Sequence, residues 1–569
     1  MRLSISKSPN AISYYVIKDC YINGKRTTKI VEKLGTHDDL LKKLDGKDPV
    51  EWAKDYINEL NKKENKEKQE VIVKYSPIKQ IPKDQQNSFN GGYLFLQQIY
   101  HELGFHNICK DISDRYDFSF NLDSILSRLV YGRIIFPSSK LATHKLSSRY
   151  IEQPDFDLQH IYRSLDVISK ETDFIQSELY KNSLKVSKRN TGILYYDCTN
   201  YFFEIEEESG FRQYGMSKEH RPNPIVQMGL FMDGDGIPLA FTINKGNTNE
   251  QQTLKPLEKK ILSDFELSKF VVCTDAGLAS NDNRKFNDRD DRAFITTQSV
   301  KKLKKHLKEW ALDPKGWSLG NDNKLYDISD LEDEREFSKT FFKERWIKEN
   351  GLEQRLIVTY SVKYKNYQSK IREKQISRAA NVIDRNPGKI KKSHQNDYKR
   401  FIDAVSFTPE GEIAEKELYK LDTELISKEA MFDGLYAVCT NLEDDVSDII
   451  RVNHRRWEIE ECFRIMKSEF KARPVYLRRD ERIIAHFTTC FISLVVYRYL
   501  EKKLNNRFTT DEIIKGLRDM NFYEIAGEGF VPTYIRNDFT DALHEAFGFR
   551  TDYQIVTAKQ MKKFFRDTK

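Results

Sequence analysis

Three carboxylates in this 569-residue sequence stand in settings that suit metal chemistry. Asp197 lies inside the β-rich run GILYYDCTNYFFE, Asp275 ends the apolar run KFVVCTD, and Glu460 belongs to the helix-forming run HRRWEIEECFRIMKSEF. Hydrolysis and transfer of phosphodiesters use two divalent cations about 4 Å apart, held by carboxylate oxygens. One carboxylate that bridges both ions and one further ligand for each ion are the minimum. The three residues therefore predict a two-metal site.

The segment 454–470 is predicted to be one continuous helix. One stripe of that helix mixes a carboxylate, two cations and an aromatic ring, which neither a core helix nor an ordinary surface helix requires. Taken alone, such a stripe is more often a solvated face with i,i+4 ion pairs, and an aspartate at a strand end more often caps a turn. The three carboxylates together favour the metal site. The stripe consists of Arg456, Glu460, Phe463 and Lys467.

The aspartates must be positioned by strands. The runs PIVQMGLFMD and IPLAFTINKG flank the turn 233–236 and predict a hairpin, and a helix is expected at about 250–265. Ligands of α/β sheets gather at the carboxyl ends of strands, which is where Asp275 falls. Asp197 lies within its strand, so we expect its side chain to project from the face that meets the Glu460 helix.

Changes in composition divide the chain into seven segments. Asn23–Gly24 between two β-rich runs predicts a hairpin, and a polar, proline-containing stretch that follows predicts a linker. The predicted segments are an N-terminal hairpin and helix module (1–61), a linker (62–92), a helical region (93–190), an α/β domain in two parts (191–299 and 433–505), an insertion (300–432) and a C-terminal helical region with a capping box at Thr509 and Glu512 (506–569). The short helices of 93–190 fit a DNA-binding region of helix-turn-helix type, and they fit an ordinary helical bundle equally well.

Composition limits the classes of function. The net charge of +7 comes from 94 basic and 87 acidic side chains, so any nucleic-acid surface must be local. Seven dispersed cysteines without a CxxC motif argue against a disulfide framework or a structural zinc site. The start of the chain lacks the apolar region of a signal peptide, and the apolar run at 490–500 is too short to span a bilayer. We expect a soluble cytoplasmic protein without membrane contact.

The segments that carry the three carboxylates, with a long β-containing insertion before the third, resemble the DDE insertion-sequence transposases. They are most similar to the bacterial subgroup whose glutamate helix has the signature tyrosine, two residues, arginine, three residues, glutamate, six residues, lysine. Arg456, Glu460 and Lys467 match that spacing, and Asn453 stands at the tyrosine position. The resemblance covers residues 191–500.

The resemblance implies an α/β fold. It would be an RNase H-like mixed sheet with flanking helices, interrupted by the insertion domain, with helical N-terminal and C-terminal regions. The implied enzyme is a DNA transposase that binds the ends of an insertion sequence, cleaves them by two-metal hydrolysis and transfers the 3′-hydroxyl ends to target DNA. Asp197, Asp275 and Glu460 would be catalytic and would hold two Mg²⁺ ions, for which Mn²⁺ can substitute.

The resemblance also implies DNA contacts on the glutamate helix. Arg456 and Lys467 would grip phosphates beside the cleaved bond. Asn453 would be able to hydrogen-bond a phosphate but not to stack as a tyrosine does. The partners would be double-stranded element ends and target DNA, bound by a homodimer on paired ends in the prokaryotic cytoplasm, at the nucleoid when DNA is bound.

Several interpretations remain open at the level of sequence. An RNase H-like nuclease without strand transfer fits the same residues, and so does a non-catalytic DNA-binding derivative, although the presence of all three carboxylates disfavours the derivative. We expect end recognition mainly in residues 1–190. Basic runs at 301–308 and 389–400 are candidate phosphate contacts. The aromatic residues of the insertion either hold an unpaired base or fill a small core of their own; examples are Trp310, Trp317 and Tyr364.

Overall fold

The computed structural model describes most of the chain in two compact units. The units are Met1–Gln86 with Ala526–Glu528, and Asn87–Ile525 with Gly529–Lys569. Within them the structure describes residues 1–9, 11–22, 25–44, 48–67, 71–73, 75–320, 322–331, 333–385, 397–405 and 418–569.

The first unit is a three-stranded antiparallel sheet with two helices. Strand β1 (Arg2–Ser8) pairs with β2 (Ala11–Ile22), which pairs with β3 (Lys25–Thr36). The predicted strands of the hairpin are present, and their Asn23–Gly24 turn lies outside the described residues. Helices α1 (His37–Lys43) and α2 (Pro49–Glu67) follow, so the helix extends past residue 61 into the segment predicted as linker.

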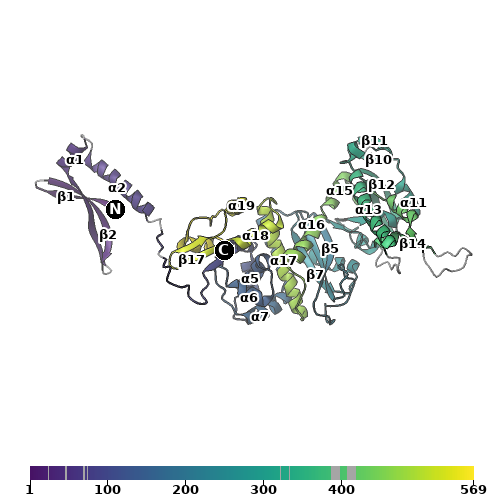
Figure 1. The fold of residues 1–569 in the computed structure, drawn as a ribbon, viewed down its shortest axis with the longest axis horizontal. Helices are drawn as coiled ribbons and strands as arrows, with labels where there is room; N and C mark the ends of the chain where they lie inside the picture. The colour runs from purple at the N-terminus through teal and green to yellow at the C-terminus, as the bar shows by residue number, and fades with distance from the viewer. Residues whose placement is uncertain are drawn as a thin grey trace, which may run out of the picture. The chain divides into compact units, whose positions relative to one another are not determined.

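The second unit has a ten-stranded mixed sheet, which confirms the predicted α/β class. The strand order is β11-β10-β12-β13-β16-β9-β8-β5-β6-β7. Strands β5, β7, β10, β11 and β12 of this sheet are labelled in Figure 1. Strands β5 to β7 form an antiparallel meander, and β8 and β9 run parallel to β5, which is the RNase H-like arrangement. The bounds are β5 Ile193–Phe202, β6 Ile225–Asp233, β7 Pro238–Lys245, η1 Glu250–Gln252, α9 Leu254–Asp264, β8 Phe270–Thr274, α10 Asn281–Phe286, β9 Arg292–Gln298 and β16 Leu435–Thr440.

The insertion extends this sheet. Strand β13 pairs with β16 of the α/β domain, and its apolar side chains share a core with Phe294, Ala437 and Cys439. The predicted boundary at 300 therefore does not separate two sheets, because edge strands satisfy their backbone groups by pairing. The bounds are η2 Val300–Lys302, α11 Lys305–Leu312, β10 Trp317–Leu319, β11 Asp322–Tyr326, α12 Asp333–Glu336, β12 Phe341–Glu349, β13 Leu352–Tyr360, α13 Val362–Arg385, η3 Tyr398–Phe401, β14 Ile402–Val405, β15 Leu418–Leu421 and α14 Thr423–Ala430.

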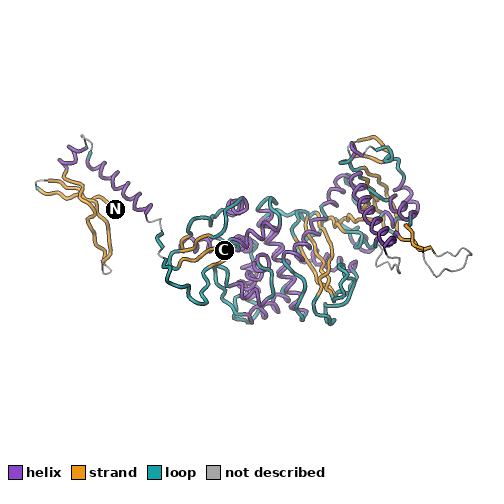
Figure 2. The backbone as a smooth tube through the Cα atoms, in the orientation of Figure 1, coloured by secondary structure: helices purple, strands orange, loops and turns teal. Residues whose placement is uncertain are grey.

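Helices pack beside the sheet in the same unit (Figure 2). Helix α17 contacts α3, α5 and α7 and also strand β7, so it joins the helical region to the sheet. It is the one helix of the described residues that is long and apolar enough for a membrane span, but 94% of that stretch is buried inside the protein. The bounds are α3 Tyr93–Glu102, α4 Phe105–Ser113, α5 Leu122–Ile135, α6 Lys140–Ser147, α7 Leu158–Lys170, α8 Thr172–Val186, α15 Val446–His454, α16 Trp457–Arg464, η4 Ile465–Glu469 and α17 Asp480–Lys503.

The C-terminal region was predicted to be helical, but it also contains three short strands. A four-stranded sheet joins β17, β18 and β19 to β4, which comes from the segment predicted as linker. Strands this short carry little periodicity in the sequence. The predicted capping box of α18 is confirmed, because Thr509 and Glu512 bond reciprocally. The bounds are β4 Ser88–Asn90, α18 Thr510–Asp519, β17 Asn521–Ile525, β18 Gly529–Pro532, α19 Asp538–Phe547, β19 Val556–Thr557 and α20 Ala558–Asp567.

Candidate active site

Asp197 lies on strand β5, and Asp275 directly follows the neighbouring parallel strand β8. Strands β5 and β8 pair with Tyr195 opposite Cys273. Continuing that register by two residues sets Asp275, directly after β8, opposite Asp197. Neighbouring strands are about 4.8 Å apart, and paired residues share a face of the sheet. The two carboxylates are therefore close neighbours on one face.

That face is the one covered by the helical segment that carries Glu460. Side chains alternate along a strand, so Asp197 points the same way as Tyr195 and Thr199. The Tyr195 hydroxyl donates to the carbonyl of Val452 in α15 at 2.8 Å, and the Lys467 ammonium donates to the Thr199 hydroxyl at 2.6 Å. The expected orientation of Asp197 is therefore the one observed.

The helix predicted at 454–470 is confirmed over most of its length, but it begins at Trp457 and ends in a π-helical turn. Helix α15 ends at His454, α16 begins at Trp457 after a turn, and residues Ile465–Glu469 form the π-helical turn η4. Helix α15 packs on β9 and α16 packs on β5. Because the strands of a sheet are twisted relative to one another, one straight helix would not follow both.

The break changes how the predicted stripe is presented. Glu460 forms an ion pair with Arg456 at an N–O distance of 3.3 Å, and the side chain of Glu460 is 56% exposed. Phe463 is buried, and Lys467 reaches back to strand β5 from the π-helical turn. Among the described residues, the carboxylate oxygens of Asp197, Asp275 and Glu460 do not all lie within 4.8 Å of one another. The structure thus brings the two aspartates together and leaves Glu460 paired with Arg456 beside them.

Burial and like charge raise the pKa of Asp197 to about 7. Desolvation is the largest cause, and the negative charge of Asp275 acts in the same direction. The cations of Lys218 and Arg456 act in the opposite direction but do not cancel the effect. Burial together with Asp275 therefore outweighs the nearby cations and disfavours the charged form of Asp197.

Lys218 is a site residue that the sequence did not reveal. It lies in the loop between β5 and β6, where its ammonium donates to the Cys198 carbonyl at 2.6 Å and pairs with Glu250 at 3.0 Å. Burial alone would lower its pKa, but the Asp197 and Glu250 carboxylates raise it. Burial and the nearby Lys218 lower the pKa of Lys467 to about 8. Nothing in the polar loop sequence signals this role.

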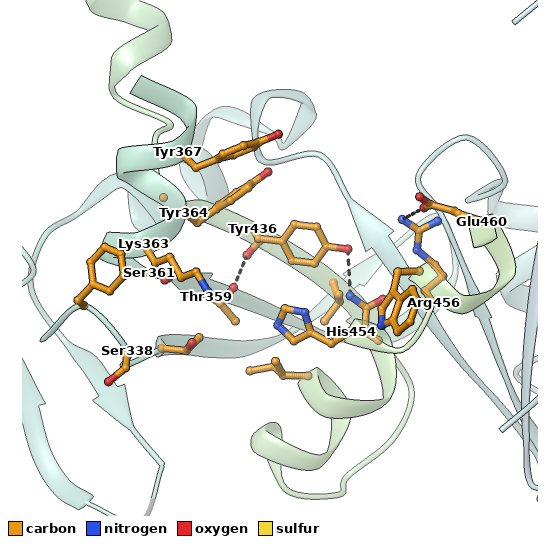
Figure 3. A pocket seen from close by; sticks show the side chains of 17 residues that line it. Ser338, Thr359, Ser361, Lys363, Tyr364, Tyr367, Tyr436, His454, Arg456 and Glu460 are labelled. Carbon is orange, nitrogen blue, oxygen red and sulfur yellow. Dashed lines mark hydrogen bonds and ion pairs between the residues drawn. The ribbon is translucent and has the colours of Figure 1, made fainter. Parts of the chain in front are cut away.

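Asn453 does not present its amide to a phosphate as expected. It is buried, its amide nitrogen donates to the Tyr436 hydroxyl at 2.9 Å, and its oxygen accepts from the Cys273 thiol at 3.7 Å. The Tyr436 hydroxyl also bonds the Thr297 hydroxyl at 2.7 Å. Asn453 therefore positions a tyrosine ring that comes from strand β16 (Figure 3).

A cavity of about 610 Å³ adjoins Arg456 and Glu460. It lies between the insertion and the α15–α16 segment, and its walls are rich in aromatic rings (Figure 3). Tyr364 and Tyr367 on α13 are stacked, with ring centroids 6.4 Å apart. The lining residues are Phe337, Ser338, Thr340, Thr359, Ser361, Lys363, Tyr364, Tyr367, Gly434, Tyr436, Val438, Ile450, Asn453, His454, Arg456, Trp457 and Glu460.

The other aromatic and basic candidates of the insertion lie elsewhere. Trp317 is fully buried, and Trp310 is half-buried against the core of the insertion, where Arg345 covers its ring. These two tryptophans therefore belong to the core of the insertion, which was one of the two interpretations of its aromatic residues. Tyr364 instead lines the cavity. In the basic run 301–308, Lys304 pairs with Glu349. Most of the run 389–400 lies outside the described residues.

A second acidic cluster is formed by Asp541, His544 and Asp552, whose ligand atoms lie within 4.8 Å of one another. Arg550 donates to both carboxylates at 2.6 Å. Arg536 also pairs with Asp541, at 2.8 Å. The arginines satisfy these carboxylates, so the cluster is an ion-pair network.

Comparisons with known proteins place the chain in a family. A family model described as a transposase DDE domain matches residues 201–496. No curated protein sequence matches the chain. A solved structure, the cryo-EM structure of a piggyBac transposase synaptic complex with hairpin DNA, matches at 9% identity and a TM-score of 0.36, covering 77% of this chain and 82% of that chain. Because the family model spans more than half of the sequence, this chain belongs to the transposases with a DDE domain.

Proposed function

We propose that this transposase binds the ends of an insertion sequence, hydrolyses phosphodiester bonds there and joins the freed 3′-hydroxyl ends to target DNA. The observation that supports this most is the parallel pairing of β5 with β8, whose register, continued by two residues, sets Asp197 opposite Asp275, and the charge of Asp275 acts on Asp197. Cations of the protein flank this pair, as expected where a polyanionic backbone binds.

The residues fit a divalent metal centre. Asp197 and Asp275 supply hard oxygen ligands, and the raised pKa of Asp197 is what buried carboxylates show when their counter-charge is missing. We assign these two aspartates and Glu460 as the ligands of two Mg²⁺ ions, with Mn²⁺ as a substitute. When bound, such ions activate the attacking oxygen and stabilise the leaving oxygen.

The cations of the protein hold the DNA in register with the carboxylates. Lys467 donates to the Thr199 hydroxyl and Lys218 to the Cys198 carbonyl, so both ammonium groups are held next to Asp197. Arg456 lies between Asp197 and Glu460. In our proposal these three side chains bind phosphates next to the cleaved bond and keep its phosphorus aligned with the carboxylates.

The aromatic cavity is the proposed place for the terminal nucleotides of the element. Its stacked Tyr364 and Tyr367 offer π-faces to an unpaired base. The Tyr436 ring, which Asn453 holds by a hydrogen bond, supplies an aromatic surface that Asn453 itself lacks. We propose that two protomers act on the two ends in concert, in a prokaryotic cytoplasm and at the nucleoid.

Cleavage of end-containing duplex DNA in Mg²⁺ tests the catalytic assignment. Asp197→Asn should abolish cleavage but retain DNA binding. The matched control is Asp235→Asn, because Asp235 lies in the β6–β7 turn on the same sheet and outside the site. Unchanged cleavage by Asp197→Asn would contradict the proposal.

Strand transfer is tested separately with a pre-cut end. Wild-type protein should join a labelled 3′-hydroxyl end to a supercoiled target plasmid. Cleavage of intact ends without any joining of the pre-cut end would identify a nuclease instead. Binding without either reaction would identify a non-catalytic DNA-binding derivative.

A further inference from the structure

The N-terminal unit has one sheet face that no described element of that unit covers. Its buried apolar side chains belong to the opposite face and to the two helices packed on it. Because paired residues share a face, the register identifies the uncovered side as the one that carries Tyr15 and Ile17. The buried apolar residues are Tyr14, Val16, Leu40, Ala53 and Ile57.

The uncovered face, which we call the open face, carries polar groups in rows across the three strands. One row is Ser4, Tyr15 and Lys33, and the next is Arg2, Ile17 and Ile30. None of these six side chains is buried, and Arg2 pairs with Asp19 of the same face at 3.1 Å. Hydroxyls and arginine bond base edges and phosphates, and aliphatic groups contact the methyl group of thymine. The open face thus has the side-chain chemistry of a DNA reader.

Charge is distributed unevenly between strands and helices in this unit. Residues 2–36 contain seven Lys and Arg against two acidic residues, whereas residues 37–67 contain seven against nine. The net charge of the whole chain is only +7. A local basic element in a chain of modest net charge is the electrostatic footprint expected of a nucleic-acid surface.

The shape of the three-stranded sheet suits binding in the major groove of DNA. Strands β2 and β3 have 12 residues each, and their pairing shifts register at two places within β2. Such irregularities increase the right-handed twist of a ribbon. The major groove of B-DNA admits a two-stranded ribbon, and several DNA-binding proteins read bases with strands.

We infer that the open face of β1–β3 enters the major groove of the element end, so that this sheet, and not a helix, reads the end sequence in the N-terminal unit. The inference rests on the proposed function, because it requires that the chain binds element ends. The ligand is duplex DNA.

Binding of full-length protein to duplex DNA tests the inference. The probes are the terminal inverted repeat that flanks the gene and a scrambled duplex of equal length and composition, at one fixed ionic strength. The test variant is Arg2→Ala with Lys33→Ala. The control variant is Lys42→Ala with Lys54→Ala, which removes the same charge from exposed positions on the two helices.

We expect the sheet variant to bind the end duplex about tenfold or more weakly and to lose preference over the scrambled duplex. The helix variant should stay within about twofold of wild type, as expected for surface cations outside the interface. Equal losses in both variants, or no loss in the sheet variant, would overturn the inference, and the second result would assign the open face to another partner.

Two further measurements keep the outcomes separate. Thermal unfolding of both variants shows whether a binding loss reflects misfolding, and Tyr15→Phe, which removes one hydroxyl from the open face, should reduce the preference for the end duplex in a folded protein. If wild-type protein neither binds nor cleaves the end, the proposed function fails. If wild type does both and the sheet variant behaves like wild type, only this inference fails.

Discussion

Two acidic clusters of this protein have opposite electrostatic surroundings. Hydrogen bonds from Arg536 and Arg550 lower the pKa of Asp541, and a hydrogen bond from Arg550 lowers that of Asp552. At the candidate active site, burial and the charge of Asp275 raise the pKa of Asp197 to about 7.

The cations nearest the two aspartates form their ion pairs with glutamates. Lys218 pairs with Glu250, and Arg456 pairs with Glu460. The carboxylates of the C-terminal cluster are therefore neutralised by arginines of the protein. The paired aspartates need a further positive charge, which a divalent cation would supply. Proximity alone would have favoured the C-terminal cluster, because within the described part of the chain its three ligand atoms lie within 4.8 Å of one another and those of Asp197, Asp275 and Glu460 do not.

The largest expected difference between the clusters is in catalysis. Asp197→Asn or Asp275→Asn should lower the rate of end cleavage by about a thousandfold or more, because each removes a ligand of the reacting centre. Asp552→Asn should leave the rate per folded molecule unchanged. Cleavage kinetics at saturating DNA measure both. A comparable loss in Asp552→Asn would remove the distinction between the clusters.

The next difference is in stabilisation by metal. Mg²⁺ at about a hundredfold its Kd should stabilise wild-type protein by about 2.7 kcal/mol, because it binds the folded state. Asp197→Asn should lose this gain and Asp552→Asn should keep it. Thermal unfolding with and without Mg²⁺ measures the effect. A gain that persists in Asp197→Asn would place the ion elsewhere.

Without metal, Asp552→Asn should be the less stable of the two variants. Asp552→Asn should lower the free energy of unfolding by about 2 kcal/mol, because it breaks hydrogen bonds to a charged partner. Asp197→Asn should leave stability unchanged or raise it, since neutralisation relieves repulsion from Asp275. Chemical denaturation in EDTA measures both variants. Destabilisation by Asp197→Asn would show that the carboxylate is already satisfied by the protein.

The last expected difference is a pH dependence that only the C-terminal cluster should show. Burial lowers the pKa of His544 to about 4 in the folded protein, against about 6.5 in an unfolded chain. The unfolded state then binds more protons between these values, so stability is full above pH 6.5 and falls as the pH drops towards 4. The difference in Tm between wild type and His544→Gln should change over this interval. A difference in Tm that stays constant over this pH interval would contradict the lowered pKa of His544.

Part of this site could be predicted from residue types and spacing. The strand end at Asp275 and the spacing of Arg456, Glu460 and Lys467 are local patterns. The register that sets Asp197 opposite Asp275 depends on pairing across 78 residues, which composition does not encode. The break after His454 depends on which strands the helices cover, which is a tertiary property.

The fold likewise has features that local sequence predicts and features that depend on pairing between distant segments. The strand and helix types of the catalytic part follow from hydrophobic periodicity, which is local. Pairing of β13 with β16 and of β4 with β17 joins distant segments, so the shared sheet of the insertion and the small C-terminal sheet were missed. Tyr436 was missed because its role depends on a hydrogen bond from Asn453, 17 residues away on another element.

Binding of Mn²⁺ followed by electron paramagnetic resonance tests the central claim most directly. Manganese replaces magnesium at oxygen sites and reports bound and free ion without any reaction. We predict that wild type and Asp552→Asn bind Mn²⁺ equally and that Asp197→Asn and Asp275→Asn lose most of the binding. Retained binding in both aspartate variants, or its loss in Asp552→Asn, would contradict the account.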